Sequence, residues 1–588
     1  MPSPSYPLFA LSLILSIAAT EPVRQHAAPF KLTGTSFGIP GVDATYDYVV
    51  VGAGIAGSVV AARLAEDPTV SVAVVEAGGF YEFSNGNLSQ IPFYSGRFVG
   101  DDGGDWAEGN RQPLVDWGVV TLPEQGLNGR RIHEAQGKCL GGGSARNQLI
   151  YHRGTVGAYA QWAELVGDDS YLYENMQQYF EKSVNFSTAN FGKRAENTSV
   201  TFNPNSYSSS GGPLQVSYPS YAHPITSYGV RSTAESSFLA EAFETSTLKA
   251  YIQTQATKIL FDAEKKATGV SVSTQGLQYT INARKEVILS AGAIFSPQLL
   301  MLSGIGPAAT LQQHGIDVLS DLPGVGQNIW NSAATGSVIY EVSLTTWQAM
   351  TDPAYAASQT DLYLKSGSGQ LTNSGGDFFA WEKLPPASRS ALPPSSLAAL
   401  STFPADWPEV EYILSSSTKA PASVPAAANR SLASIGVALT AALSRGNVTL
   451  ASADPADLPV VQLNFLLDET DRAVAVAAWR RAREAWRGVP DGVRLGKEVF
   501  PGEDVVADEE LVEMVRETAR PVHHVAASCK MGKADDPMAV VDSKARVFGV
   551  KGLRVVDASS FVFTPPGHTQ GYTYAHAEKL ADDIKNGQ

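Results

Sequence analysis

Short apolar runs and glycine-rich turns alternate near the start of the chain. Residues 48–51 (YVVV) and 70–75 (VSVAVV) are apolar runs of strand length, and residues 58–65 between them form a stretch rich in Ala and Val. Apolar runs of four to eight residues are typical of buried strands, whereas the longer Ala-rich stretch favours a helix. Asp67-Pro68 then ends that helix. The pattern predicts a strand–helix–strand unit of a parallel sheet.

Similar patterns return further along the chain. Residues 269–273 and 287–291 read as strands, the segment that begins at Gly292 opens a helix, and a final helix is expected at 571–584. Residues 468–487 predict a helix that Asp468 caps and that the Gly-Val-Pro sequence at 488–490 ends. The stretch 387–428 is rich in Ala, Ser and Pro, and we expect it to form surface excursions around a few strands.

Three glycines join the first predicted strand to its helix. Gly52, Gly54 and Gly57 provide a tight turn, close approach of the backbone to a pyrophosphate, and close helix–strand packing. The helix N-terminus offers free N–H groups to that pyrophosphate. Glu76 stands 19 residues after Gly57, where it would accept hydrogen bonds from a ribose diol. The alternative is a glycine-rich turn in an ordinary strand–helix–strand unit. The spacing favours a dinucleotide site.

Composition narrows the class of protein. With 588 residues, 44% hydrophobic, the chain is large enough for more than one structural unit. Its net charge of −15 argues against nucleic acid as a partner. Only Cys139 and Cys529 occur, which excludes a disulfide scaffold. They are expected either as two buried free thiols or as one bridge.

The N-terminal residues read as a secretory signal. Residues 7–19 form an apolar stretch of signal-peptide length, so we expect a signal peptide at 1–20 and a secreted protein. The stretch is short for a stable membrane anchor, and no Lys or Arg precedes it. Acceptor sequences for N-glycosylation agree with the secretory route and occur at Asn87, Asn185, Asn197, Asn429 and Asn447.

Further glycine-rich and histidine-containing segments follow in a fixed order. They are GKCLGGGSARN at 137–147, GAIFSPQLLMLSGIG at 292–306, LPGVGQN at 322–328, HVAASCKMG at 524–532 and VVDAS at 555–559. Together with the first glycine turn, these segments resemble the glucose–methanol–choline (GMC) family of flavoprotein oxidoreductases. The resemblance covers almost the whole chain from residue 46 onward.

This resemblance implies an α/β fold with two domains. A Rossmann-like FAD-binding domain would comprise residues 40–165, 246–335 and 521–588. A substrate-binding domain, with an antiparallel sheet and helices, would be inserted as residues 166–245 and 336–520.

The resemblance also implies FAD as the cofactor. Arg146 stands where a few members carry a His that bonds covalently to the flavin, so the FAD is expected to be held non-covalently. No metal is expected. The implied cofactor-binding residues are Gly52, Gly54, Ile55, Ala56, Gly57, Glu76, Gly142, Asn147, Ala256, Asp557, Ala558 and Gln570.

Two histidines are the candidate catalytic residues. The family's base falls at His524, and its second His or Asn, which binds the same substrate oxygen, falls at His568. A neutral imidazole suits this role because its ordinary pKa lies near 6.5. His523 and Arg146 are expected to line the substrate pocket.

The chain departs from the family pattern at three further places. Asn331-Ser332 replaces the usual Asp-His, and Ala527-Ser528 replaces the usual Gly-Thr after the catalytic His. His523 also replaces the aromatic residue that tends to precede that His in members acting on aromatic alcohols, which argues against such a substrate.

The function implied is oxidation of a small-molecule alcohol. Oxygen and another electron acceptor are both open as the oxidant, and metabolite tailoring and extracellular oxidation of alcohols or sugars are both open as the role. In the alternative function, the protein keeps the fold and FAD but catalyses no net redox reaction, as a cyclase, lyase or photodecarboxylase. Retention of both His524 and His568 favours the redox reaction.

Overall fold

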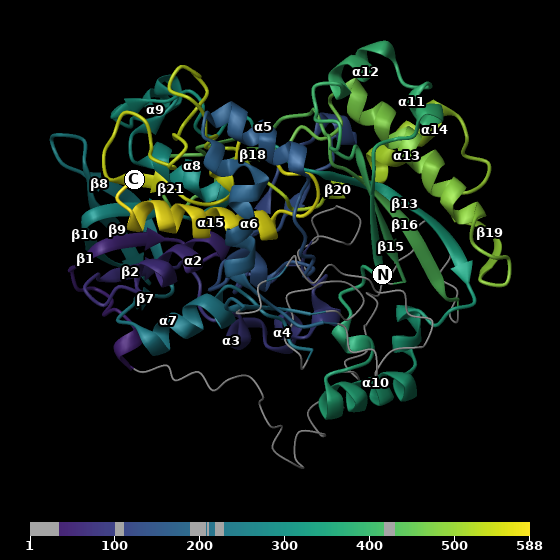
Figure 1. Ribbon diagram of the computed structural model, residues 1–588, viewed down its shortest axis with the longest axis horizontal. Helices are drawn as coiled ribbons and strands as arrows, with labels where there is room; N and C mark the ends of the chain where they lie inside the picture. Colours follow the sequence, from purple (N-terminus) through teal and green to yellow (C-terminus); the bar gives the residue numbers. More distant parts are fainter. Residues whose placement is uncertain (1–33, 100–110, 189–206, 208–210, 218–228, 417–429) are drawn as a thin grey trace, which may run out of the picture.

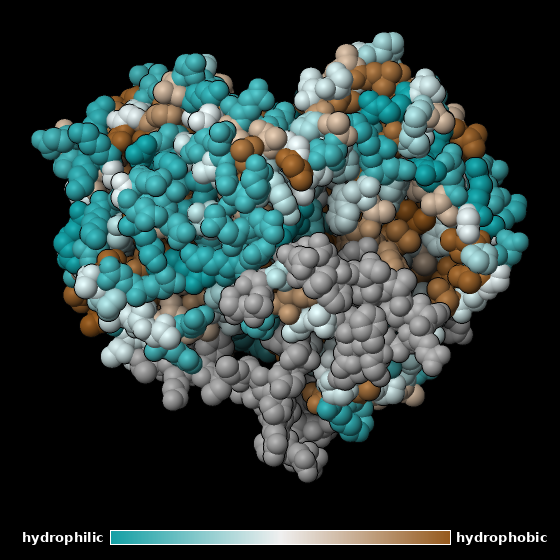
Figure 2. Space-filling view, viewed as in Figure 1, coloured by the Kyte–Doolittle hydropathy of each residue, from teal (hydrophilic) through white to brown (hydrophobic). Residues whose placement is uncertain are grey.

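A computed structural model describes residues 34–99, 111–188, 207, 211–217, 229–416 and 430–588. The predicted signal peptide and the sequons at Asn197 and Asn429 lie outside these residues. Two large sheets lie side by side in Figure 1, each with its own helices. On the face drawn in Figure 2, hydrophilic residues dominate over the lobe of the first sheet.

The first sheet is the expected Rossmann-like sheet. Four strands run parallel in the order β7-β2-β1-β10, β21 joins β10 in parallel, and β9 and β8 extend β10 as an antiparallel ribbon. The strands are β1 (Ala44–Val51), β2 (Val72–Val75), β7 (Lys249–Tyr251), β8 (Thr254–Phe261), β9 (Ala267–Thr274), β10 (Leu277–Leu289) and β21 (Leu553–Val555). They come from three separated parts of the chain, which a shared buried core holds together.

Helices cover this sheet and begin at its carboxyl edge. Helix α2 (Ile55–Leu64) begins directly after Gly54, three residues earlier than the sequence predicts, so Gly57 lies within the helix rather than in the turn. It packs against the last helix, α15 (Gln570–Lys585), where Arg63 pairs with the buried Glu578. Helix α8 (Gly292–Leu302) follows β10, as expected. Helices α5 (Val156–Val166) and α6 (Tyr173–Ser183) lie nearby, and α6 packs on α15.

The second sheet is antiparallel and has the strand order β14-β15-β16-β13-β19, with β20 paired to β13. Its strands are β13 (Ala333–Val342), β14 (Phe378–Glu382), β15 (Val410–Ser415), β16 (Leu432–Leu439), β19 (Arg494–Phe500) and β20 (Arg520–Pro521). Helices α13 (Glu469–Arg487) and α14 (Asp508–Thr518) pack on it, and α10 (Pro353–Ser366) stands at the other end of this lobe in Figure 1. The Asp468 cap of α13 is confirmed, since its side chain accepts the Thr470 N–H.

One part of this lobe is more regular than the sequence predicts. Of residues 387–428 the structure describes 387–416, where strand β15 is preceded by two short helices, α11 (Pro386–Arg389) and α12 (Pro394–Leu400), that contact α13. Pro385 and Pro393 stand just before these helices and Pro386 and Pro394 open them, a position that proline tolerates well. The boundaries proposed for the two domains stay a prediction.

Candidate active site

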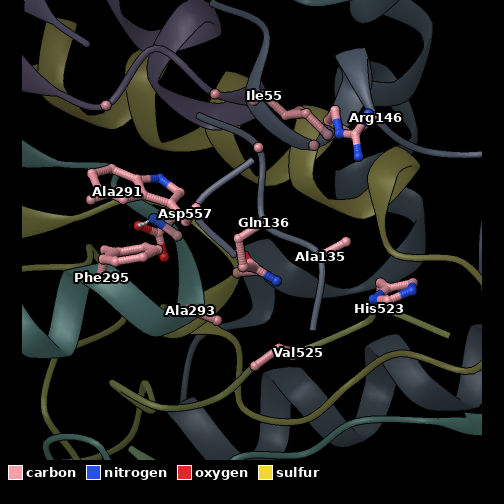
Figure 3. Close-up of a pocket in the computed structure, with 18 of the residues that line it drawn as sticks. Ile55, Ala135, Gln136, Arg146, Ala291, Ala293, Phe295, His523, Val525 and Asp557 are labelled. Carbon is pink, nitrogen blue, oxygen red and sulfur yellow. Dashed lines mark hydrogen bonds between the residues drawn. The ribbon is translucent and has the colours of Figure 1, made fainter. Parts of the chain in front are cut away.

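A cavity opens at the carboxyl ends of β1 and β2 and reaches Ile413 on β15 of the second sheet. In a parallel sheet this edge is where helix N-termini and loops gather, and ligands bind there. Figure 3 shows Asp557 beside Phe295 on one side of the view, and Arg146 and His523 on the other. Every residue predicted from the sequence to bind cofactor or substrate, or to catalyse, lines this cavity except Gly57.

The glycines allow two loops to meet at the cavity wall. Gly142 has φ +49°, and a Cβ there would lie only 2.7 Å from the Cα of Gly54. Gly57 serves packing instead, because a Cβ on it would lie 1.9 Å from the carbonyl oxygen of Gly52. Bare backbone on both loops leaves N–H groups open to a ligand at the start of α2.

Glu76 is buried at the end of β2 and lines the cavity. Its carboxylate accepts the Ala53 N–H at 3.0 Å and the Gly78 N–H at 2.9 Å, which fixes its position below the glycine turn. Burial raises its pKa to about 7, although these two N–H groups oppose that shift. A buried carboxylate with free lone pairs fits a ligand that donates hydroxyl groups.

The other predicted cofactor residues are held by contacts between distant segments. The Asp557 carboxylate accepts the Gly292 N–H at the start of α8 (2.9 Å) and the Ser296 hydroxyl (2.6 Å). Ala558 follows it in the cavity wall, and Ala256 lines the wall from β8. Asn147 donates to the Gln570 side chain at 3.0 Å, which joins the second glycine segment to the start of α15.

His524 and His568 face each other in the cavity. Their ring centroids lie 4.8 Å apart at an interplanar angle of 84°, and both side chains are buried. Within the described ranges nothing hydrogen-bonds to the buried Nδ1 of His524. Burial, and then the neighbouring imidazoles with His568 first, lower the pKa of His524 well below its ordinary 6.5. His524 is therefore a neutral imidazole in the wall of the cavity.

His568 has two partners that the sequence does not reveal. Its Nε2 lies 2.7 Å from the Glu411 carboxylate on β15. A carboxylate accepts hydrogen bonds, so the N–H group of His568 is at Nε2 and donates a hydrogen bond to Glu411. Its backbone N–H donates to Nε2 of His152. Burial lowers the pKa of His152 to about 4, so its imidazole is neutral and Nε2 can accept that bond. Both partners are far from His568 in sequence, and no local motif marks them.

Arg146 and His523 line the cavity, as expected, and each lies beside a buried carboxylate. Arg146 donates to the Phe98 carbonyl at 2.7 Å and lies 3.4 Å from Asp116. His523 lines the cavity, and its Nδ1 lies 3.1 Å from Glu134. The roles of Arg146 and His523 toward a substrate stay predictions.

Comparison with known proteins identifies the chain. Models of the GMC oxidoreductase family match residues 46–333 and 442–577. Patulin synthase from Aspergillus clavatus is 43% identical over 99% of both chains, and versicolorin B synthase from Aspergillus parasiticus is 41% identical over 94% of this chain and 90% of its own. The chain belongs to the GMC oxidoreductase family. It is an FAD-dependent oxidoreductase.

Solved structures agree with this fold. An FAD-dependent oxidoreductase from Chaetomium thermophilum superimposes with a TM-score of 0.79 at 27% identity, covering 92% of this chain and 99% of its own. A formate oxidase gives a TM-score of 0.80 at 22% identity, covering 94% of this chain and 99% of its own, a likeness of fold. The bare backbone at Gly54 and Gly142 and the free lone pairs of Glu76 fit FAD at the cavity found here.

The other predictions concern the two cysteines, the N-glycosylation sites, metal binding and membrane anchoring. Cys139 and Cys529 are both buried free thiols, so the bridge is not formed. Asn87 and Asn185 are exposed, whereas Asn447 is half-buried in β17 (Asn447–Thr449). Among the described residues no group of three or more His, Cys, Asp or Glu is arranged to hold a metal ion. In the same residues no helix combines the length and apolar character needed to cross a bilayer.

Proposed function

We propose that this enzyme oxidises the alcohol group of a small molecule to a carbonyl. The hydroxyl proton passes to His524, and the carbon-bound hydrogen leaves as a hydride. When bound, FAD supplies the acceptor for that hydride. The observation that carries the proposal is the neutral imidazole of His524, which lines the cavity opposite His568.

The two histidines have different roles toward the hydroxyl group of the substrate. His524 accepts the proton, a role that typically accelerates a reaction by about 10²–10⁴-fold. Glu411 and His152 hold His568 in one orientation opposite His524, and His568 contacts the same oxygen from that side. A hydrogen-bonding group fixed opposite the base holds the hydroxyl group in one orientation.

A panel of alcohols tests the reaction. We would mix the FAD-loaded enzyme anaerobically with benzyl alcohol, cinnamyl alcohol, glucose, methanol and choline, and follow bleaching of the flavin absorption band. Reduction by at least one alcohol supports oxidation, and repeating turnover with oxygen and with a quinone identifies the acceptor. If an added compound is converted while the flavin stays oxidised throughout, the non-redox alternative holds instead.

Variants then test the base. His524→Ala should slow flavin reduction by at least about 10²-fold while FAD stays bound, because only proton removal is lost. His523→Ala should mainly change substrate preference and KM, since His523 lines the cavity beside the base. A collapse of the rate in His523→Ala, with His524→Ala near wild type, would assign the base to His523.

We further propose secretion and metabolite tailoring. The apolar residues 7–19 and the exposed sequons at Asn87 and Asn185 support entry into the secretory route. The names of the relatives, patulin synthase and versicolorin B synthase, support a reaction in the synthesis of a fungal metabolite. Expression of the full chain in a filamentous fungus, with N-terminal sequencing and endoglycosidase digestion of the culture medium, tests secretion. Protein that stays in the cells with Met1 intact would refute it.

FAD is proposed to be held without a covalent bond, because Arg146 replaces the histidine that bonds to flavin in some relatives. Acid precipitation should release all of the flavin into the supernatant. Flavin that stays with the chain through a denaturing gel would refute this.

A further inference from the structure

Asn331 is one of the positions where this chain departs from its family, and the structure shows what surrounds it. Asn331 is buried just before β13. Its Oδ1 accepts the backbone N–H of His524 at 2.9 Å, and its Nδ2 donates to Oε2 of Glu134 at 3.0 Å. An N–H group requires an acceptor and a carboxylate requires a donor, so these two neighbours fix the orientation of the amide.

Glu134 holds the other adjacent histidine directly. It lies on β4 (His133–Glu134), and its side chain is fully buried. Its Oε1 lies 3.1 Å from Nδ1 of His523 and accepts from Gln136 at 3.2 Å, while Oε2 accepts from Asn331. One carboxylate therefore contacts the side chain of His523 and, through Asn331, the backbone of His524.

The backbone that carries the base explains why such contacts matter. His523 has φ +62° and Ala527 has φ +64°, so residues with side chains take the left-handed conformation on both sides of His524. This conformation is uncommon for residues other than glycine and persists where the surroundings enforce it. The contact between Asn331 and the His524 N–H lies within this segment.

We infer that Glu134 and Asn331 form a matched pair of positioning residues that fixes the place of the base, and that Glu134 is the reason for an amide at position 331. This inference rests on the proposed role of His524. An aspartate at 331 could still accept the His524 N–H, but it would oppose Glu134 with a second carboxylate at about the 3.0 Å of the present contact. Two carboxylates so close cannot both ionise without strong repulsion.

The inference predicts a rescue. Asn331→Asp alone should lower the limiting rate of flavin reduction by at least about tenfold, because the pair repels and the His524 backbone shifts. Adding Glu134→Gln should restore the rate to within about threefold of wild type. In the double variant the new amide at position 134 donates to the new carboxylate at position 331 and accepts from His523. The contacts and the net charge then both match the wild type.

Asn128 offers a matched control. Its Nδ2 also donates to a glutamate, Glu513, at 2.6 Å, but this pair is exposed and does not line the cavity. Asn128→Asp therefore introduces the same like-charge pair at a remote site, and its rate of flavin reduction should equal that of the wild type. All variants are prepared as FAD-loaded full-length protein, with FAD content and melting temperature measured on each.

The outcomes separate the two proposals. A low rate and low melting temperature in Asn331→Asp, both recovered in the double variant, support the matched pair. If the melting temperature falls in Asn331→Asp and recovers in the double variant while the rate of flavin reduction equals that of the wild type in every variant, Glu134 and Asn331 do not position the base. If neither the rate nor the melting temperature recovers in the double variant, the two residues do not act as a pair. If none of the panel alcohols reduces the wild-type flavin, the proposed reaction fails, and the melting temperatures alone decide whether the pair exists.

Discussion

At the scale of single residues, the buried imidazole of His524 determines how the proposed oxidation depends on pH. A base works only when neutral, and an ordinary histidine with a pKa near 6.5 is only about one-quarter neutral at pH 6. The pKa of His524 lies well below that value. We therefore expect the limiting rate of flavin reduction to stay level from pH 8 down to pH 6. Anaerobic rapid mixing at several pH values measures it, and an acid limb with a midpoint near 6.5 would contradict this prediction.

Glu411 gives a second prediction at this scale. It orients His568 from the second sheet, so Glu411→Ala should slow flavin reduction by about 10–10²-fold, while Glu411→Gln, which still accepts the Nε2 proton, should lose less. Glu382→Gln on the neighbouring strand β14 is the control, because Glu382 pairs with Arg481 and does not line the cavity. Equal rates in Glu411→Ala and wild type would show that His568 needs no partner.

At the scale of elements, the contact between the two glycine loops makes a prediction about FAD. Gly142→Ala places a methyl group 2.7 Å from the Cα of Gly54 and at a positive φ, so the loops must separate. We expect much reduced FAD content after gel filtration. Gly492→Ala is the control, since a Cβ there meets nothing within 4 Å. Full FAD content in Gly142→Ala would show that the two loops tolerate separation.

The elements also show what local sequence can and cannot specify. The glycine turn, the Asp468 cap and the start of α8 depend on residues close together in the chain, and each was predictable from pattern alone. Helices α11 and α12 were not, because Ala, Ser and Pro occur in both loops and short helices. The partners Glu134, Asn331 and Glu411 lie 157–389 residues from the histidines that they contact, and only the folded chain brings them together.

At the scale of the whole molecule, the site requires both sheets. Glu411 comes from the second sheet, His568 precedes α15, which packs on helix α2 beside the first, and His524 follows β20, which pairs with β13. The cavity correspondingly runs from the glycine turn to β15. A change that loosens the contact between the lobes should therefore affect the pairing of His524 with His568 as well as FAD binding.

Buried neutral histidines predict how the whole fold responds to acid. Burial lowers the pKa of His576 on α15 to about 3, and it lowers that of His152 to about 4. Because the unfolded chain binds these protons near pH 6.5 and the folded chain does not, stability is full above pH 6.5 and falls as the pH drops below it. By this linkage His576 alone costs about 2 kcal/mol between pH 6.5 and pH 5.

His576→Gln tests this linkage away from the cavity. His576 packs among aromatic rings and contacts the Ser560 hydroxyl at 3.0 Å, a contact that glutamine can also make. The variant should melt at a lower temperature than wild type at pH 7, because packing is lost, but its melting temperature should fall less between pH 7 and pH 5. Parallel pH dependence of the two proteins would show that His576 is already protonated in the folded state, and that its burial does not contribute to acid sensitivity.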